Sequence, residues 1–188
     1  MKVVLFNGSP RKEGNTYHCL KIVMEQLENE GVECDYNWIG MEKLRGCTAC
    51  MQCVENGDNR CVLKGDNMND YIEKMIEADG IILGSPTYFA DTATNIKALI
   101  ERAGYATGGK LKHKVGAAVV AVRRAGATHV FSSINYFFLI KQMFVVGSSY
   151  WNLGVGKQPG DVLKDEEGIQ TFKNLGQNFA FLLKKIHQ

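Results

Sequence analysis

The sequence predicts an α/β fold in which helices cover both faces of a doubly wound parallel sheet. Short apolar runs of strand length alternate along the chain with segments whose apolar residues repeat at helical spacing. The connections are long enough for right-handed crossovers between parallel strands. A chain of 188 residues can bury a full core, so we expect one domain over 1–188. Within it, a cysteine-rich insertion is expected at about 46–66.

The first strand, helix and second strand are expected in the N-terminal part of the chain. Residues 2–6 are almost wholly apolar, as in a central strand that is covered on both faces. The helix after this strand has apolar residues at the i, i+3, i+4 and i+7 positions, namely Leu20, Val23, Met24 and Leu27. Residues 33–39 are less apolar and predict a strand at an edge of the sheet.

The same alternation continues to the end of the chain. Further strands are expected at 80–84, 115–122 and 144–146. Further helices are expected around 68–75, at 92–103, at 131–143 and over the last apolar repeat, from Phe172 to Ile186. In sheets of this kind ligands bind beyond the carboxyl ends of the strands. The loops after the first, third and fourth strands should therefore carry the chemistry.

Composition argues against two classes of partner. The 22 basic residues are scattered among 20 acidic ones, for a net charge of +2, so nucleic acid is not expected as a partner. No apolar run approaches the roughly 18 residues that a membrane span needs, and no cleavage-like site follows the opening segment. We expect a cytoplasmic protein without a membrane partner.

The loop after the first strand has the residues of a phosphate site. Ser9, Arg11, Asn15 and Thr16 bring two hydroxyls, a guanidinium and an amide to a turn that opens a helix. Unpaired N–H groups and the helix dipole favour an anion there, and arginine adds a bidentate donor. The loop lacks the glycine pattern of dinucleotide sites and the ending of triphosphate loops. An ordinary polar turn with an N-cap residue is the alternative interpretation.

The loop after the third strand offers groups suited to a planar ring. Pro86 stiffens the exit from the strand, and Thr87 adds a hydroxyl. Tyr88 and Phe89 add aromatic faces. The alternative is that both aromatic side chains only pack against a helix end, since aromatic residues bury a large area wherever they lie.

Both loops resemble those of the NAD(P)H-dependent FMN reductase family. The resemblance covers the first loop at 8–16, the second loop at 85–89 and the helix residues 95–102 that follow it. It implies a flavodoxin-like five-stranded sheet of order 2-1-3-4-5, with FMN as cofactor and NAD(P)H as co-substrate. The first loop would hold the flavin phosphate and the second would line the flavin ring.

The same resemblance implies a homodimer or homotetramer, and the aromatic run 136–140 is a candidate subunit contact.

The resemblance also points to the loop after the fourth strand, where Arg123, Arg124 and Gly126 would lie beside the flavin. Three alternatives stand for the two arginines. They can bind the phosphates of NAD(P)H, pair with acidic groups of a neighbouring subunit, or remain solvated at the surface.

Four cysteines form a compact group between the second and third predicted strands. Cys47, Cys50 and Cys53 stand in a Cys-x-x-Cys-x-x-Cys run, and Cys61 follows after seven residues. Such spacing can hold three corners of a [4Fe–4S] cube, with the fourth cysteine closing it. The motif resembles that of the iron-sulfur flavoproteins, which carry it in the equivalent insertion. A zinc site, or reduced cysteines without a metal, are the alternatives.

Taken with these patterns, the family resemblance implies an FMN-dependent oxidoreductase that passes electrons from NAD(P)H through bound FMN to an unidentified acceptor. No side chain is expected as a catalytic acid or base, because the flavin carries the chemistry. The alternative function is that of an iron-sulfur flavoprotein, an electron-transfer module between protein partners such as ferredoxin.

Overall fold

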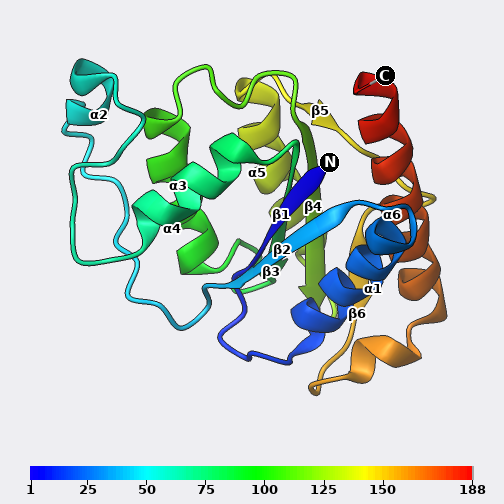
Figure 1. The fold of residues 1–188 in the computed structure, drawn as a ribbon. Coiled ribbons are helices and arrows are strands. Elements are labelled where there is room, and N and C mark those ends of the chain that lie inside the picture. The colour runs from blue at the N-terminus through cyan, green and yellow to red at the C-terminus, as the bar shows by residue number, and fades with distance from the viewer. Residues whose placement is uncertain (188) are drawn as a thin grey trace.

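A parallel sheet runs through the centre of the molecule. The computed structural model describes residues 1–187. Neighbouring strands pair in the order β2-β1-β3-β4-β5, all parallel, which confirms the predicted order (Figure 1). The strands are β1 (Lys2–Asn7), β2 (Glu33–Trp38), β3 (Gly80–Pro86), β4 (Val115–Val122) and β5 (Phe144–Val145).

A sixth strand, β6 (Leu153–Val155), was not predicted. It pairs with the carboxyl half of β4, where Val120 lies opposite Leu153, whereas β5 pairs with the amino half, where Val115 lies opposite Phe144. Two short strands therefore share the edge beside β4. This arrangement brings the chain after β6 to the carboxyl ends of the central strands, where the candidate site lies.

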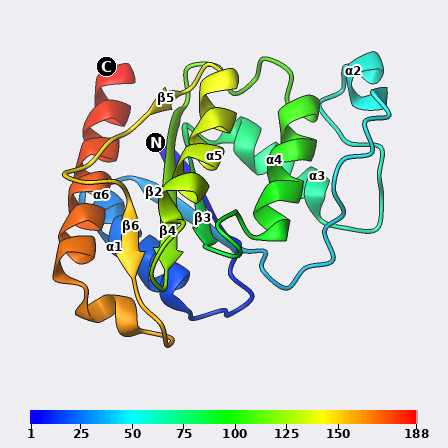
Figure 2. The same ribbon diagram turned by 180° about the vertical axis from the view of Figure 1, so that it is seen from behind.

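Helices form a layer on each face of the sheet, as predicted. On one face α1 (Asn15–Asn29) packs beside α6 (Glu166–Ile186), while α3, α4 and α5 cover the other (Figures 1 and 2). The bounds of these three helices are Met68–Glu77, Thr94–Ala106 and Ala127–Ile140. Of two shorter helices, α2 (Gln52–Asn56) lies beyond the α3–α4 layer, whereas the 3-10 helix η1 (Asp161–Lys164) packs against α1 and α6 and buries Val162 in the core of that face.

The core consists of two apolar clusters, one on each face of the sheet. Alternate residues of β4, which is buried throughout, face the two clusters: Val115 and Val119 contribute to one and Ala118 and Val120 to the other. This double burial explains why the central strands are continuous apolar runs. At Gly116 the ring of Phe138 fills the space that a side chain would need, at 2.8 Å from the position of a Cβ atom.

Helix α5 begins four residues earlier than predicted and ends three residues earlier. Gly126 precedes it with a φ of +87°, so the chain turns into the helix at Ala127 rather than at Phe131. The helix is amphipathic: Phe138 is buried, whereas Tyr136 and Ile140 are exposed. Part of the aromatic run 136–140 is thus core, and the remainder faces outward.

Residues 46–66, here called the cysteine segment, lie between β2 and α3 and include α2. The segment extends from the edge of the α3–α4 layer, away from the sheet (Figure 1). Within residues 1–187 no helix is long and apolar enough to cross a membrane.

Candidate functional site

The loop after β1 folds back on itself before α1 begins. The Asn7 side-chain oxygen accepts a hydrogen bond from the Ser9 N–H at 2.9 Å, and Ser9 Oγ accepts one from the Arg11 N–H at 3.2 Å. Trp38 of β2 holds the outside of the loop by donating Nε1–H to the Ser9 carbonyl at 2.7 Å. In the described chain no side chain caps the start of α1 at Gly14. The first N–H groups of the helix are therefore free to meet an anion.

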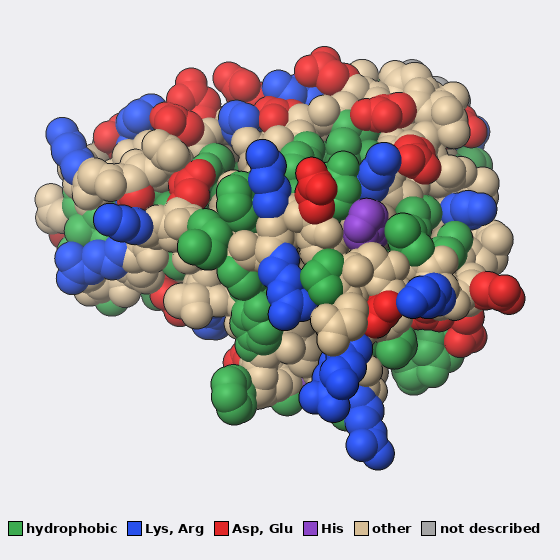
Figure 3. Space-filling model, turned by 90° about the horizontal axis from the view of Figure 1, so that it is seen from below, with side chains coloured by type: hydrophobic (Ala, Val, Ile, Leu, Met, Phe, Trp, Pro, Cys, Tyr) green, Lys and Arg blue, Asp and Glu red, His purple; other side chains and the backbone are tan. Residues whose placement is uncertain are grey.

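A pocket of about 260 Å³ opens at this point, where the carboxyl ends of the strands meet. Eight of the predicted residues line it: Ser9, Arg11, Asn15, Thr16, Pro86, Thr87, Tyr88 and Arg123. Figure 3 shows this side of the molecule from below, with several Lys and Arg side chains gathered near its centre and lower rim. The structure thus brings three separate loops together at one pocket, as the order of the strands predicts.

Two buried hydroxyls in the pocket wall have no hydrogen-bond partner. They are Oγ1 of Thr16, from the first turn of α1, and Oγ1 of Thr87, from the loop after β3. Neither finds a donor or acceptor among residues 1–187. Buried polar groups are nearly always paired, so two unpartnered hydroxyls on residues that line one pocket fit a site for a polar ligand. The cationic lining by Arg11, Arg123 and Lys157 suits a phosphate.

The other three predicted residues, Phe89, Arg124 and Gly126, do not line the pocket. Phe89 and Ala90 form a two-residue turn with positive φ at both positions, closed by backbone hydrogen bonds between Tyr88 and Asp91 of 2.9 and 3.0 Å. The Phe89 side chain stands fully exposed at the tip of this turn.

Gly126 supports this turn from behind, because a Cβ atom there would lie 2.9 Å from Ala90. Arg124 is exposed to solvent. Gly126 thus contacts the second loop rather than the pocket.

Four lining residues were missed, and two of them, Ala121 and Val122, lie at the end of β4. Gly156 and Lys157 follow β6, and the Gly156 N–H donates to the Val122 carbonyl at 2.8 Å. A Cβ atom on Gly156 would lie 2.7 Å from the side-chain nitrogen of Asn15. The absence of a side chain at Gly156 therefore lets the loop after β6 approach the start of α1 closely. The only sequence signal was the pair of glycines at 154 and 156 beside a three-residue strand.

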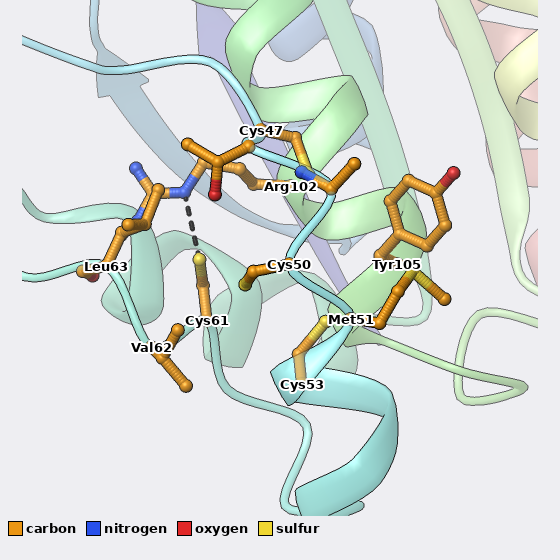
Figure 4. A pocket seen from close by; sticks show the side chains of 11 residues that line it. Cys47, Cys50, Met51, Cys53, Cys61, Val62, Leu63, Arg102 and Tyr105 are labelled. Atoms are coloured by element: carbon orange, nitrogen blue, oxygen red, sulfur yellow. Dashed lines mark hydrogen bonds between the residues drawn. The ribbon is translucent and has the colours of Figure 1, made fainter.

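The four predicted metal-binding cysteines surround a second pocket. Cys47, Cys50, Cys53 and Cys61 all line it, and all are free thiols (Figure 4). The space between them is about 10 Å³, room for roughly one water molecule. Within residues 1–187 no three His, Cys, Asp or Glu side chains converge closely enough to hold a metal ion. The donor set fits an iron-sulfur cluster in kind, and the pocket must widen to hold one.

Helix α4 anchors the cysteine segment through two neighbouring side chains. Oε2 of Glu101 accepts a hydrogen bond from the Cys47 N–H at 3.2 Å. The next residue, Arg102, donates Nε–H to Sγ of Cys61 at 3.2 Å. The loop that carries Tyr88 leads into α4, and Arg102 and Tyr105 near the end of this helix line the cysteine pocket.

Comparison with known proteins identifies the family. Residues 1–158 match the model of the family described as NADPH-dependent FMN reductase. This chain belongs to the NADPH-dependent FMN reductase family. It is a flavoprotein oxidoreductase, and the family to which it belongs binds FMN.

Relatives within this group are named iron-sulfur flavoproteins. One from Methanocaldococcus jannaschii is 39% identical over 194 residues, covering 99% of both chains. One from Methanosarcina thermophila is 32% identical over 196 residues, covering 100% of this chain and 98% of the relative. Among solved structures, the flavodoxin-like WrbA-like protein of Agrobacterium tumefaciens superposes with a TM-score of 0.68 at 14% identity, covering 98% and 97% of the two chains. This last likeness shows that the fold is flavodoxin-like.

Proposed function

We propose that FMN binds in the pocket at the carboxyl edge of the sheet and passes electrons from NAD(P)H to an acceptor. The observation that carries this proposal is the pair of unpartnered hydroxyls of Thr16 and Thr87 in a pocket lined by cations. The flavin phosphate would lie at the uncapped start of α1 with Ser9, Arg11, Asn15 and Thr16. The ring would lie along Pro86, Thr87 and Tyr88.

The residues of this chain would bind and orient the cofactor rather than take part in proton transfer. When bound, FMN supplies hydride and single-electron chemistry. Arg11 and Arg123 would neutralise the phosphate, and the N–H groups of α1 would fix its position. The half-exposed Tyr88 would shield one edge of the ring while leaving a face open to a second substrate.

The test is flavin binding followed by rapid reduction. Purified protein is titrated with FMN while fluorescence quenching is recorded, and the complex is then mixed anaerobically with NADPH or NADH. We expect stoichiometric binding and bleaching of the flavin absorbance within seconds. A protein that fails to bind FMN would refute the site, and bound FMN that only a ferredoxin-like carrier reduces would refute NAD(P)H as the donor.

A second proposal concerns the cysteine segment. We propose that Cys47, Cys50, Cys53 and Cys61 hold a [4Fe–4S] cluster, which would make the protein an electron-transfer module between the flavin and a protein partner. The four cysteines that line one pocket support it, as does the similarity to relatives named iron-sulfur flavoproteins.

Anaerobic reconstitution, with iron, acid-labile sulfide and zinc analysis, tests this second proposal. We expect about four irons and four sulfides per chain, and loss of both in Cys53→Ser. Zinc alone, or no metal, would refute the cluster. Flavin titration of the same samples keeps this outcome separate from that of the FMN site.

We further propose that residues 1–188 form one domain that assembles as a homodimer or homotetramer through α5. Tyr136, Leu139 and Ile140 are 68%, 57% and 79% exposed on that helix. A groove beside them runs between α4 and α5 and includes Ile100 and Tyr105. A second copy of the chain would cover this apolar face.

A further inference from the structure

Arg102 is a charged side chain buried inside the protein at the edge of the cysteine pocket. It is 1% exposed, and it lines the pocket together with the four cysteines. Its guanidinium donates to four groups: Nε to Sγ of Cys61 at 3.2 Å, Nη1 to Oδ2 of Asp66 at 2.5 Å and to the Arg45 carbonyl at 3.3 Å, and Nη2 to the Leu63 carbonyl at 3.2 Å. A charge this deeply buried is retained only where its partners are well placed.

Each of the four acceptors of the Arg102 guanidinium has a separate role. Asp66 balances the charge of Arg102, and its other oxygen is held by the Met68 N–H at 3.2 Å. The Nη groups also donate to the carbonyls of Arg45, which precedes the four cysteines, and of Leu63, which follows Cys61. These two bonds hold the chain on both sides of the four cysteines. The Nε–H is left for the sulfur, and Figure 4 shows this bond reaching Cys61 from the α4 side of the pocket. Within residues 1–187, Cys61 is thus the one cysteine of the four whose sulfur accepts from a buried cation, whereas the Cys47 sulfur accepts from the backbone N–H of Ala49 at 3.3 Å.

Arginine is suited to this arrangement because its planar fork presents fixed donors in several directions at once. A hydrogen bond to a ligating sulfur stabilises the reduced state of a cluster, which carries more negative charge, and so raises its potential. Glu101 at the other end of the segment binds only the backbone N–H of Cys47. It holds the loop without donating to a sulfur, which makes it a natural control.

We propose that Arg102 is a positioning residue that fixes Cys61 and, through its Nε–H donation to the sulfur, raises the reduction potential of the cluster held by the cysteine segment. This inference rests on the proposed cluster. It adds that the four sulfurs are not equivalent. In a bound cluster, the Nε–H of Arg102 would stabilise negative charge on the Cys61 sulfur, beside α4.

The experiment compares Arg102→Gln with Glu101→Gln in anaerobically reconstituted protein. Iron and sulfide contents are measured first, followed by redox titration of cluster and flavin in the same sample. In Arg102→Gln we expect a normal iron content and a cluster whose reduction equilibrium shifts about tenfold toward the oxidised form, or 59 mV for a one-electron couple. The flavin potential should not change. Glu101→Gln removes a negative charge beside Cys47, so it should not shift the cluster toward the oxidised form, and the flavin potential should keep its wild-type value.

Arg102→Gln leaves Asp66 buried without its partner, so the double variant Arg102→Gln with Asp66→Asn removes the whole ion pair. It should fold and show a shift in the same direction, smaller because no unpaired carboxylate remains. Wild-type potentials in both folded variants would overturn the role of Arg102. Wild-type protein without iron would overturn the cluster itself, and the inference with it, while FMN binding is unaffected.

A metal-free measurement provides an independent readout. In protein without iron, the Arg102 Nε–H resonance should exchange slowly with solvent and change its chemical shift in Cys61→Ala. A resonance that is indifferent to Cys61→Ala would overturn the contact.

Discussion

Thr16→Val separates the stability of the protein from its affinity for FMN. The Thr16 hydroxyl is buried at 1% exposure and unpartnered in the described chain, so in the absence of ligand it costs about 1–3 kcal/mol. Valine has the same shape and a similar helix propensity. We therefore expect the ligand-free variant to be as stable as wild type or more stable, by up to about 3 kcal/mol.

The same substitution should weaken FMN binding. A hydrogen bond to a charged acceptor such as a phosphate contributes about 1.5–3 kcal/mol, so the Kd should rise at least about tenfold. At an FMN concentration of 100 times the wild-type Kd, the ligand stabilises wild type by about 2.7 kcal/mol, and a tenfold weaker variant by about 1.4 kcal/mol. Urea unfolding with and without FMN measures both quantities.

Thr107→Val is the matched control for this experiment. Thr107 is equally buried, but its hydroxyl donates to the Ala103 carbonyl at 2.7 Å, far from the pocket. It should lose about 1 kcal/mol of stability and keep the wild-type FMN affinity. If Thr16→Val instead destabilised the ligand-free protein and left the Kd unchanged, the hydroxyl would not be a ligand of the phosphate.

Three further predictions concern Gly126 behind the second loop, the exposed face of α5 and the thiol of Cys34. Gly126→Ala should destabilise the ligand-free protein by about 1–2 kcal/mol in urea, because alanine is strained at a φ of +87° and would press on Ala90; unchanged unfolding would contradict this. Ile140→Asp should lower the apparent mass in light scattering without loss of folding, because Ile140 is 79% exposed, and an unchanged mass would argue against α5 as the contact. Burial raises the pKa of Cys34 from an ordinary 9.0 to about 12, so folding favours the protonated thiol. The contribution of this thiol to the free energy of unfolding is complete below pH 9 and is lost as the pH rises toward 12. Cys34→Ala should therefore lose less stability than wild type over that range, and parallel pH curves for the two proteins would disprove the assignment.

Much of the fold could be predicted because the central strands are buried on both faces. Their apolar runs leave little choice of element, and the loops between them must then meet at one edge of the sheet. Eight of the eleven predicted flavin-site residues line the pocket for this reason. The pattern carries less information where an element is short. Residues 153–155 form a strand only because the open edge of β4 offers them partners, so Gly156 and Lys157 could not be placed.

The remaining differences come from local backbone geometry. The family resemblance of the loop at 85–89 predicted Phe89 beside the flavin ring, but the tight turn points successive side chains in different directions. The aromatic run of α5 likewise divides between core and surface, since Phe138 packs on Gly116 while Ile140 lies outside. In both places the residue types were informative, and their directions depended on a φ angle or a helix start that the sequence pattern does not specify.

The Phe89–Ala90 turn places a limit on engineering this protein. Two non-glycine residues with φ of +49° and +60° occupy positions where Asn-Gly would be relaxed, so a consensus design would replace them and gain thermal tolerance. That change would also delete the exposed phenyl ring from the tip of the turn next to Tyr88, which lines the proposed FMN pocket. A stabilised version of this protein should therefore be sought at other positions, and the strained pair kept unless the ring proves dispensable in turnover.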